Sequence, residues 1–158
     1  RPTSDIVRES LFNILSPVIV GNSFLDLFCG TGAVGIEALS RGADRVRFVD
    51  VSKESVKLAS ENLASLKIAE RPVHSEGVSF LLKTSEKFGI IFLDPPYKSD
   101  FGIKALETIA TGNVLEDGGI VVYENEKPFV GQITGLEKYD ERKYGRAYIT
   151  FFRRTKND

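Results

Sequence analysis

The sequence predicts a doubly wound α/β fold, in which a mostly parallel seven-stranded sheet ends in an antiparallel hairpin at the C-terminus. Three observations lead to this prediction. Strand-like and helix-like segments alternate from the N-terminus to about residue 125. Ile90–Leu93 is a continuous apolar run, as expected of a central parallel strand that is buried on both faces. Near the C-terminus only Gly145 and Arg146 separate two strand-like segments, a spacing typical of a hairpin.

The first element is a helix within residues 1–17. Apolar side chains recur at helical spacing over residues 5–15, Thr3 or Ser4 can cap the start, and Pro17 is expected to follow the end. Further helices are predicted over residues 33–41, after the capping residue Ser52 to about residue 66, at 77–83 and at 100–110. The predicted strands are 23–28, 45–50, a short one around Val73, 90–93, 120–123 after Gly118-Gly119, 138–144 and 147–153.

The composition fits one globular domain over residues 1–158. The chain is 42% hydrophobic and 27% charged, with a formal net charge of −1, which argues against non-specific binding to bare nucleic acid. No apolar run approaches the roughly 18 residues of a membrane span. The single Cys29 and single His74 favour a cytoplasmic protein without disulfide or metal, and we expect a monomer. Because the sequence has no Met, we expect that it begins inside a longer reading frame.

A glycine-containing loop follows the first predicted strand, with the sequence Asp26-Leu27-Phe28-Cys29-Gly30-Thr31-Gly32. Ligands of doubly wound sheets bind at this edge. The glycines from Gly30 to Gly35 also fit a dinucleotide-binding pattern, and a plain turn without ligand stays possible. The Asp26 carboxylate would sit badly beside a pyrophosphate, but well beside the cationic methionine part of S-adenosylmethionine. Asp50 ends the next strand, where a carboxylate can accept hydrogen bonds from the ribose hydroxyls of either cofactor.

Asp94-Pro95-Pro96-Tyr97 directly follows the apolar run and carries the chemical prediction. A strand terminator would explain the prolines but neither the Asp nor the Tyr. The Asp94 carboxylate and Pro95 carbonyl can accept hydrogen bonds from a planar amino group, which makes its nitrogen more sp³-like and aims the lone pair at a methyl donor. Tyr97 can stack on the base that carries this amino group. The pattern therefore predicts N-methylation.

Three segments together resemble the RsmD family, the bacterial 16S rRNA guanine-N2 methyltransferases. They are the RPTSDIVRESLFN stretch at residues 1–13, the cofactor loop with its following helix at 25–42, and the DPPY tetrapeptide. The resemblance runs over nearly the whole chain and implies a Rossmann-like class I S-adenosylmethionine methyltransferase. Family members also carry a basic, Gly-containing segment ahead of the first stretch, which this sequence lacks.

The resemblance implies that the enzyme methylates N2 of a guanine, numbered 966 by convention, in 16S rRNA of the small ribosomal subunit. The residues implied to contact the cofactor are Asp26, Phe28, Gly30, Thr31, Gly32, Asp50, Val51, Glu76 and Gly77. Asp94, Pro95, Pro96 and Tyr97 would hold the guanine, while Arg8, Lys98 and Arg146 are candidate RNA contacts. DNA adenine-N6 methylation, protein glutamine methylation and a non-catalytic module that binds S-adenosylmethionine or RNA are the alternatives.

Overall fold

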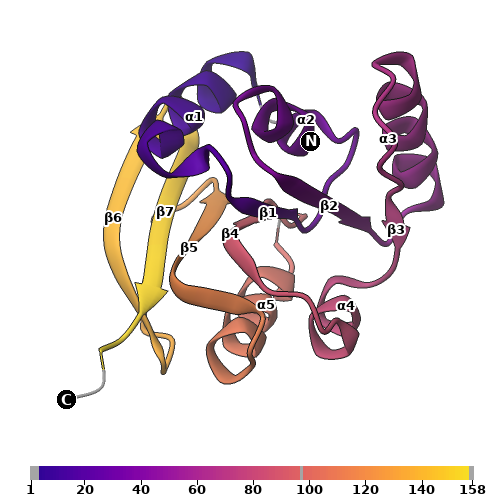
Figure 1. The fold of residues 1–158 in the computed structure, drawn as a ribbon. Coiled ribbons are helices and arrows are strands. Elements are labelled where there is room, and N and C mark those ends of the chain that lie inside the picture. Colours follow the sequence, from indigo (N-terminus) through magenta and orange to yellow (C-terminus); the bar gives the residue numbers. More distant parts are fainter. Residues whose placement is uncertain (1–3, 97, 157–158) are drawn as a thin grey trace.

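The computed structural model describes residues 4–96 and 98–156. Five helices and seven strands alternate along this part of the chain (Figure 1). The helices are α1 (Asp5–Ile19), α2 (Ala33–Ser40), α3 (Lys53–Ser65), α4 (Gly77–Lys83) and α5 (Phe101–Thr111). The strands are β1 (Ser23–Asp26), β2 (Arg45–Asp50), β3 (Val73–His74), β4 (Phe88–Leu93), β5 (Leu115–Asn125), β6 (Leu136–Tyr144) and β7 (Ala147–Arg154).

All seven strands form one sheet in the order β3-β2-β1-β4-β5-β7-β6. The first five pair in parallel, and β7 pairs antiparallel with both β5 and β6. The prediction of a doubly wound, mostly parallel sheet closed by a C-terminal hairpin is therefore confirmed. The chain order reverses between β1 and β4, where Asp26 lies opposite Phe92. Ligands of such sheets bind beyond the carboxyl ends of the strands at this reversal.

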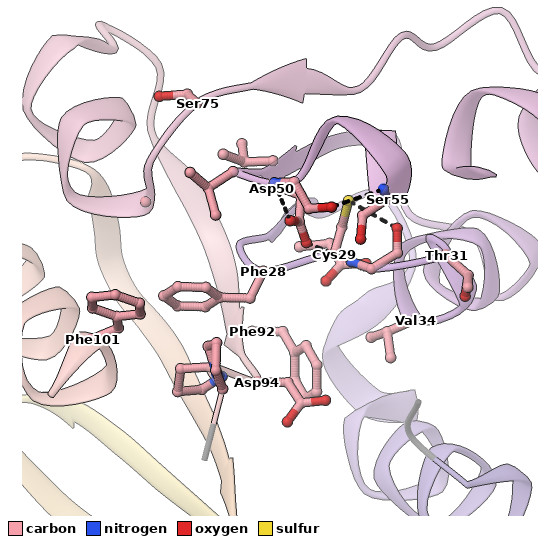
Figure 2. A pocket seen from close by; sticks show the side chains of 18 of the residues that line it. Phe28, Cys29, Thr31, Val34, Asp50, Ser55, Ser75, Phe92, Asp94 and Phe101 are labelled. Atoms are coloured by element: carbon pink, nitrogen blue, oxygen red, sulfur yellow. Dashed lines mark hydrogen bonds between the residues drawn. The ribbon is translucent and has the colours of Figure 1, made fainter. Parts of the chain in front are cut away.

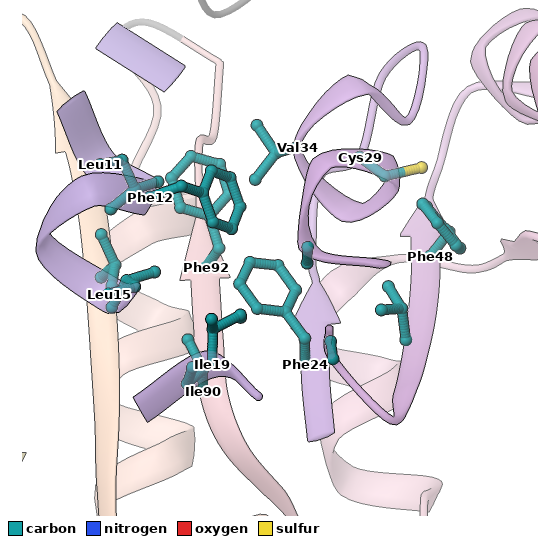
Figure 3. Close-up of a cluster of buried hydrophobic side chains, with 14 of the residues drawn as sticks. Leu11, Phe12, Leu15, Ile19, Phe24, Cys29, Val34, Phe48, Ile90 and Phe92 are labelled. Atoms are coloured by element: carbon teal, nitrogen blue, oxygen red, sulfur yellow. The ribbon is translucent and has the colours of Figure 1, made fainter. Parts of the chain in front are cut away.

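The sheet separates two hydrophobic clusters. On one face α1, α2 and α3 pack against the sheet, and α4 and α5 cover the other face (Figure 1). In the first cluster the rings of Phe12 on α1 and Phe24 on β1 lie 5.9 Å apart (Figure 3). Every residue of β4 is buried, as the apolar run predicted. Clusters on both faces hold β1 and β4 rigidly, so the loops after these strands start from fixed points.

Three predicted boundaries were wrong. The first strand, predicted over residues 23–28, ends at Asp26, because the chain turns at Leu27 and Phe28. Pro17 lies inside α1, which continues to Ile19. A proline in the last turn removes only one helical hydrogen bond, and burial of Ile19, which is 2% exposed, continues the apolar face. Gly118 and Gly119 lie within β5 rather than before it, because the strand already begins at Leu115 beside Phe88. The register between β4 and β5 shifts between Phe88 and Ile90, and this irregularity accommodates the two glycines.

No helix within residues 4–96 and 98–156 combines the length and apolar character that a membrane span requires.

Candidate active site

A cavity of about 580 Å³ opens at the carboxyl ends of β1, β2 and β4, at the reversal of strand order (Figure 2). Its lining comes from five segments that lie far apart in the sequence. They are the loop after β1, the end of β2 with the start of α3, the turn before α4, the end of β4 with Asp94-Pro95-Pro96, and Phe101 on α5. The fold therefore brings together the two loops on which the sequence prediction depends.

Asp26 lies in the floor of the cavity and is only 1% exposed. Its Oδ2 atom accepts a hydrogen bond of 2.9 Å from the backbone N–H of Gly35. The pKa of Asp26 is raised from 3.8 to about 7, chiefly by burial. The bond from Gly35 opposes this rise, and the neighbouring carboxylates Asp94 and Asp50 contribute to it. A cation bound in the cavity would replace this repulsion between carboxylates with attraction.

The loop after β1 has an unusual backbone, since Phe28, Gly30 and Gly32 all have positive φ, at 68°, 54° and 86°. The backbone N–H groups of Phe28 and Cys29 both donate to the carbonyl of Val49, which ties the loop to β2. A phenylalanine rarely adopts this conformation, so these two bonds and the packing of its ring must stabilise it. The loop consequently turns its backbone and the Phe28 ring toward the cavity.

Gly32 does not line the cavity, although we expected it beside the cofactor. Gly32 is the N-cap residue of α2 and has a left-handed backbone conformation. A Cβ added to it would lie 3.5 Å from the Ala59 side chain and 3.6 Å from the Phe48 ring. Gly35 has a packing role as well, because a Cβ there would lie 2.3 Å from the ring of Phe48. Within the glycine pattern, Gly30 alone therefore borders the ligand space, and the other two set the approach of α2 to the sheet.

Asp50, at the end of β2, organises two neighbouring segments. Its Oδ2 atom accepts from the backbone N–H of Gly30 at 2.9 Å, and its Oδ1 atom accepts from Ser52, also at 2.9 Å. A carboxylate offers about four acceptor sites, so two remain for the vicinal hydroxyls of a ribose. Asp50 thus fits the role expected of it and also fixes the loop that it faces.

Glu76 and Gly77 border the far end of the cavity. The Glu76 carboxylate caps α4 by accepting from Val78 and Ser79, and the bond from the Ser79 hydroxyl lowers the pKa of Glu76. At Gly77 an added Cβ would lie 3.3 Å from the Phe28 ring. Phe28, Val51, Gly77 and Phe101 therefore provide an apolar wall that suits a planar base. Figure 2 shows the rings of Phe28 and Phe101 in this wall.

Asp94, Pro95 and Pro96 line the cavity at the end of β4, and Tyr97 lies outside the described residues. Asp94 is half-buried, Pro95 is buried and Pro96 is exposed. Burial, followed by the charge of Asp94, raises the pKa of the neighbouring Tyr123. An acceptor carboxylate thus faces the same cavity as Asp26 and Asp50.

The three candidate RNA contacts occupy different surroundings. Arg8 on α1 pairs with Asp5 at 2.8 Å and lies 3.7 Å from Glu37 on α2. Lys98 and Arg146 are exposed, and neither has an ion pair within residues 4–96 and 98–156. Lys98 follows the tetrapeptide with φ of 56°, and Arg146 lies in the turn between β6 and β7.

Several cavity residues were not predicted. Ser52, Ser55 and Ser75 add hydroxyls, and Phe101 adds an aromatic ring from the start of α5. Phe101 could have been predicted from its position, because it lies four residues after Tyr97 and at the start of a predicted helix. Cys29 also lines the cavity, and burial raises the pKa of its thiol, in agreement with its interpretation as a buried filler. Its position does not suit a nucleophile. His74 contacts the carbonyl of Val51, and the described residues contain no metal-binding group of three or more His, Cys, Asp or Glu.

The strand order and the cavity define a class I methyltransferase fold. Residues 1–153 match the model of the family "Conserved hypothetical protein 95", and the chain belongs to this family, the RsmD family. Ribosomal RNA small subunit methyltransferase D of Escherichia coli is 38% identical over 127 residues, which cover 80% of this chain and 64% of that protein. The YlbH protein of Bacillus subtilis is 39% identical over 138 residues, with coverages of 80% and 72%. The yhhF structure of Escherichia coli superposes with a TM-score of 0.86 at 32% identity, covering 98% and 88%.

S-adenosylmethionine is the cofactor of this family, and the cavity residues fit it. Asp26 is a buried carboxylate that would face its cationic amino acid part, Asp50 has free acceptor sites for its ribose, and the wall around Phe28 is apolar enough for its adenine. The expected cofactor residues, Gly32 excepted, all border this one cavity.

Proposed function

We propose that this protein transfers a methyl group from S-adenosylmethionine to the exocyclic N2 amino group of a guanine in 16S rRNA, at the position numbered 966 by convention. The observation that carries the proposal is the shared cavity. Asp94-Pro95-Pro96 begins where β4 ends, beside the loop that would hold the cofactor. The similarity to small-subunit rRNA methyltransferases supports ribosomal RNA as the substrate.

The residues of the site would act mainly by positioning the guanine amino group against the methyl group of the cofactor. Asp94 and the carbonyl of Pro95 accept hydrogen bonds from the two N–H groups of the guanine amino group and hold its nitrogen toward the cofactor. When bound, S-adenosylmethionine supplies an electrophilic methyl group. As the bond from nitrogen to the methyl carbon forms and the bond from that carbon to sulfur breaks, Asp94 stabilises the positive charge on nitrogen. No finely tuned base is needed, because the proton passes to water after transfer. Tyr97 stacks on the guanine, while Lys98, Arg146 and Arg8 are the proposed RNA contacts.

The substrate is the small ribosomal subunit, and the protein acts as a monomer in the cytoplasm. A direct experiment supplies S-adenosylmethionine labelled in its methyl group together with small subunits that lack the modification. Free 16S rRNA, double-stranded DNA and a protein mixture are tested in parallel. We expect label in 16S rRNA, and nuclease digestion should release it as N2-methylguanosine. Label in DNA or protein alone would overturn the proposal, as would label at another atom of the RNA.

A further inference from the structure

The turn between β6 and β7 is a short, rigid projection. Only Gly145 and Arg146 connect the strands, whose last pair is Tyr144 opposite Ala147, and Gly145 has the positive φ of 60° that such tight turns require. Ala147 is buried in the cluster beneath α1, and Tyr144 packs against the same cluster. The projection is therefore anchored in the hydrophobic core and does not behave as a free loop.

This projection points beyond the same sheet edge as the cavity. The parallel strand β5 carries Asn125 at its carboxyl end, and Asn125 lies opposite Tyr148 of β7. Since β7 runs antiparallel to β5, the turn that precedes it extends past that edge (Figure 1). From Leu93, which pairs with Tyr123, the turn lies about 13 Å along the strand direction and about 10 Å to the side, at roughly 3.3 Å per residue and 4.8 Å per strand.

The charges on the projection are not balanced by nearby carboxylates. Lys143 and Arg146 are exposed, and in the described part of the chain neither forms an ion pair. The Lys143 ammonium instead lies 5.5 Å from the centre of the Tyr148 ring. By contrast, Arg45 and Arg47 pair with Glu86, and Arg153, at the other end of the same hairpin, pairs with Glu137. Within β6, β7 and their turn, the exposed cations that form no ion pair, Lys143 and Arg146, thus both lie at the end nearest the cavity.

We propose that the β6–β7 projection, defined here as residues 143–148, is a phosphate-binding arm that grips RNA nucleotides next to the target guanine. This proposal rests on the proposed function and deepens it. The Arg146 guanidinium can bind a phosphate through two parallel N–H bonds, and Lys143 adds a second charge. Contacts of this kind set the position of the strand without reading its sequence. Because the arm is anchored in the hydrophobic cluster beneath α1, a phosphate bound to it would lie at a fixed distance from Asp94.

The test compares a double variant of the arm with a matched control. Lys143→Gln/Arg146→Gln removes two charges from the arm. Lys87→Gln/Lys156→Gln removes two charges at the opposite edge of the sheet, where both side chains are exposed and without ion pairs among the described residues. Binding of each protein to unmodified small subunits is measured between about 50 and 200 mM salt, and binding of S-adenosylmethionine is measured separately.

We expect the arm variant to bind RNA roughly tenfold more weakly, with a plot of log affinity against log salt that is shallower by about 1.5, close to the loss of two phosphate contacts. The KM for the subunit should rise, while kcat and cofactor affinity stay near the wild-type values. The control should match the wild type throughout. Equal effects in both variants, or none in the arm variant, would overturn the arm while leaving the methyltransferase proposal standing. A wild-type protein that neither binds nor methylates the subunit would instead refute the proposed function.

Discussion

The Oδ2 atom of Asp26 lies 2.9 Å from the backbone nitrogen of Gly35 and accepts its hydrogen. Burial nevertheless raises the pKa of Asp26 to about 7 from an ordinary value of 3.8. The protein without cofactor should therefore be most stabilised by this group below about pH 4, where Asp26 is protonated in the folded and unfolded states alike. That stability is lost as the pH rises through about 7, by at most about 4 kcal/mol.

The variant Asp26→Asn should remove this pH dependence. Thermal unfolding of both proteins between pH 4 and pH 8 gives the comparison, and the difference between them isolates Asp26 from other titrating groups. As the pH rises, the unfolding free energy of the wild type should fall relative to that of the variant. The variant should therefore become the more stable protein near pH 8. Parallel curves over the whole range would contradict the assignment.

The affinity for S-adenosylmethionine should rise with pH in the same interval. Ionised Asp26 attracts a cation, whereas protonated Asp26 does not, so binding releases a proton below about pH 7. Calorimetry in two buffers with different ionisation enthalpies measures that proton release. Asp26→Asn should bind more weakly at pH 8 and release no proton, and proton release that persists in the variant would assign it elsewhere.

Asp94→Ala should abolish most methyl transfer and spare the cofactor. Losing one transition-state hydrogen bond of this kind lowers kcat by about 100- to 1000-fold. Binding of S-adenosylmethionine, followed by calorimetry, should stay within about twofold of the wild type. Asp100→Ala provides the control, because Asp100 is an exposed carboxylate on the same segment whose ion pair among the described residues is with Lys104. Near-normal turnover of Asp94→Ala would refute the proposed mechanism.

Gly35→Ala should destabilise the fold, because the added Cβ would lie 2.3 Å from the Phe48 ring. Overpacking of this kind costs about 1–3 kcal/mol. Chemical denaturation of Gly35→Ala, Phe48→Leu and the double variant tests the cause. If the clash is responsible, the double variant should lose less stability than the sum of the single variants. Strict additivity would show that the two residues do not interact.

Asn62→Leu should weaken cofactor binding although Asn62 does not line the cavity. Its Nδ2 atom donates to the carbonyl of Thr31 at 2.9 Å and so holds the loop after β1 from α3. An exposed hydrogen bond contributes about 1 kcal/mol, which corresponds to roughly a fivefold change in affinity. The adjacent Glu61→Gln is the control, and Asn62→Gln should recover part of the loss. A Kd equal to the wild-type value would rule out this support.

Much of the cavity could be predicted from sequence because parallel strands bring their carboxyl ends to one edge. Asp50 ends a predicted strand, Asp94 follows one and Asp26 lies near the end of one, and all three border the cavity. The role of Gly32 could not be assigned in this way. A glycine that makes room for a ligand and a glycine that makes room for the Phe48 ring look identical in the sequence. Likewise, the role of Asn62 depends on how α3 lies against the loop, and helical periodicity carries no information about that distance.

The strand order also determines how early during synthesis the central pair of strands, β1 and β4, can form. Phe24 in β1 pairs with Ile90 in β4, sixty-six positions later in the chain. At about 5–20 residues per second, a ribosome would need roughly 3 to 13 seconds to deliver that partner. During this interval β1 has β2 on one side and an open apolar edge on the other. Until β4 emerges, a newly made chain therefore presents the unpaired backbone groups of β1 to other chains and to chaperones.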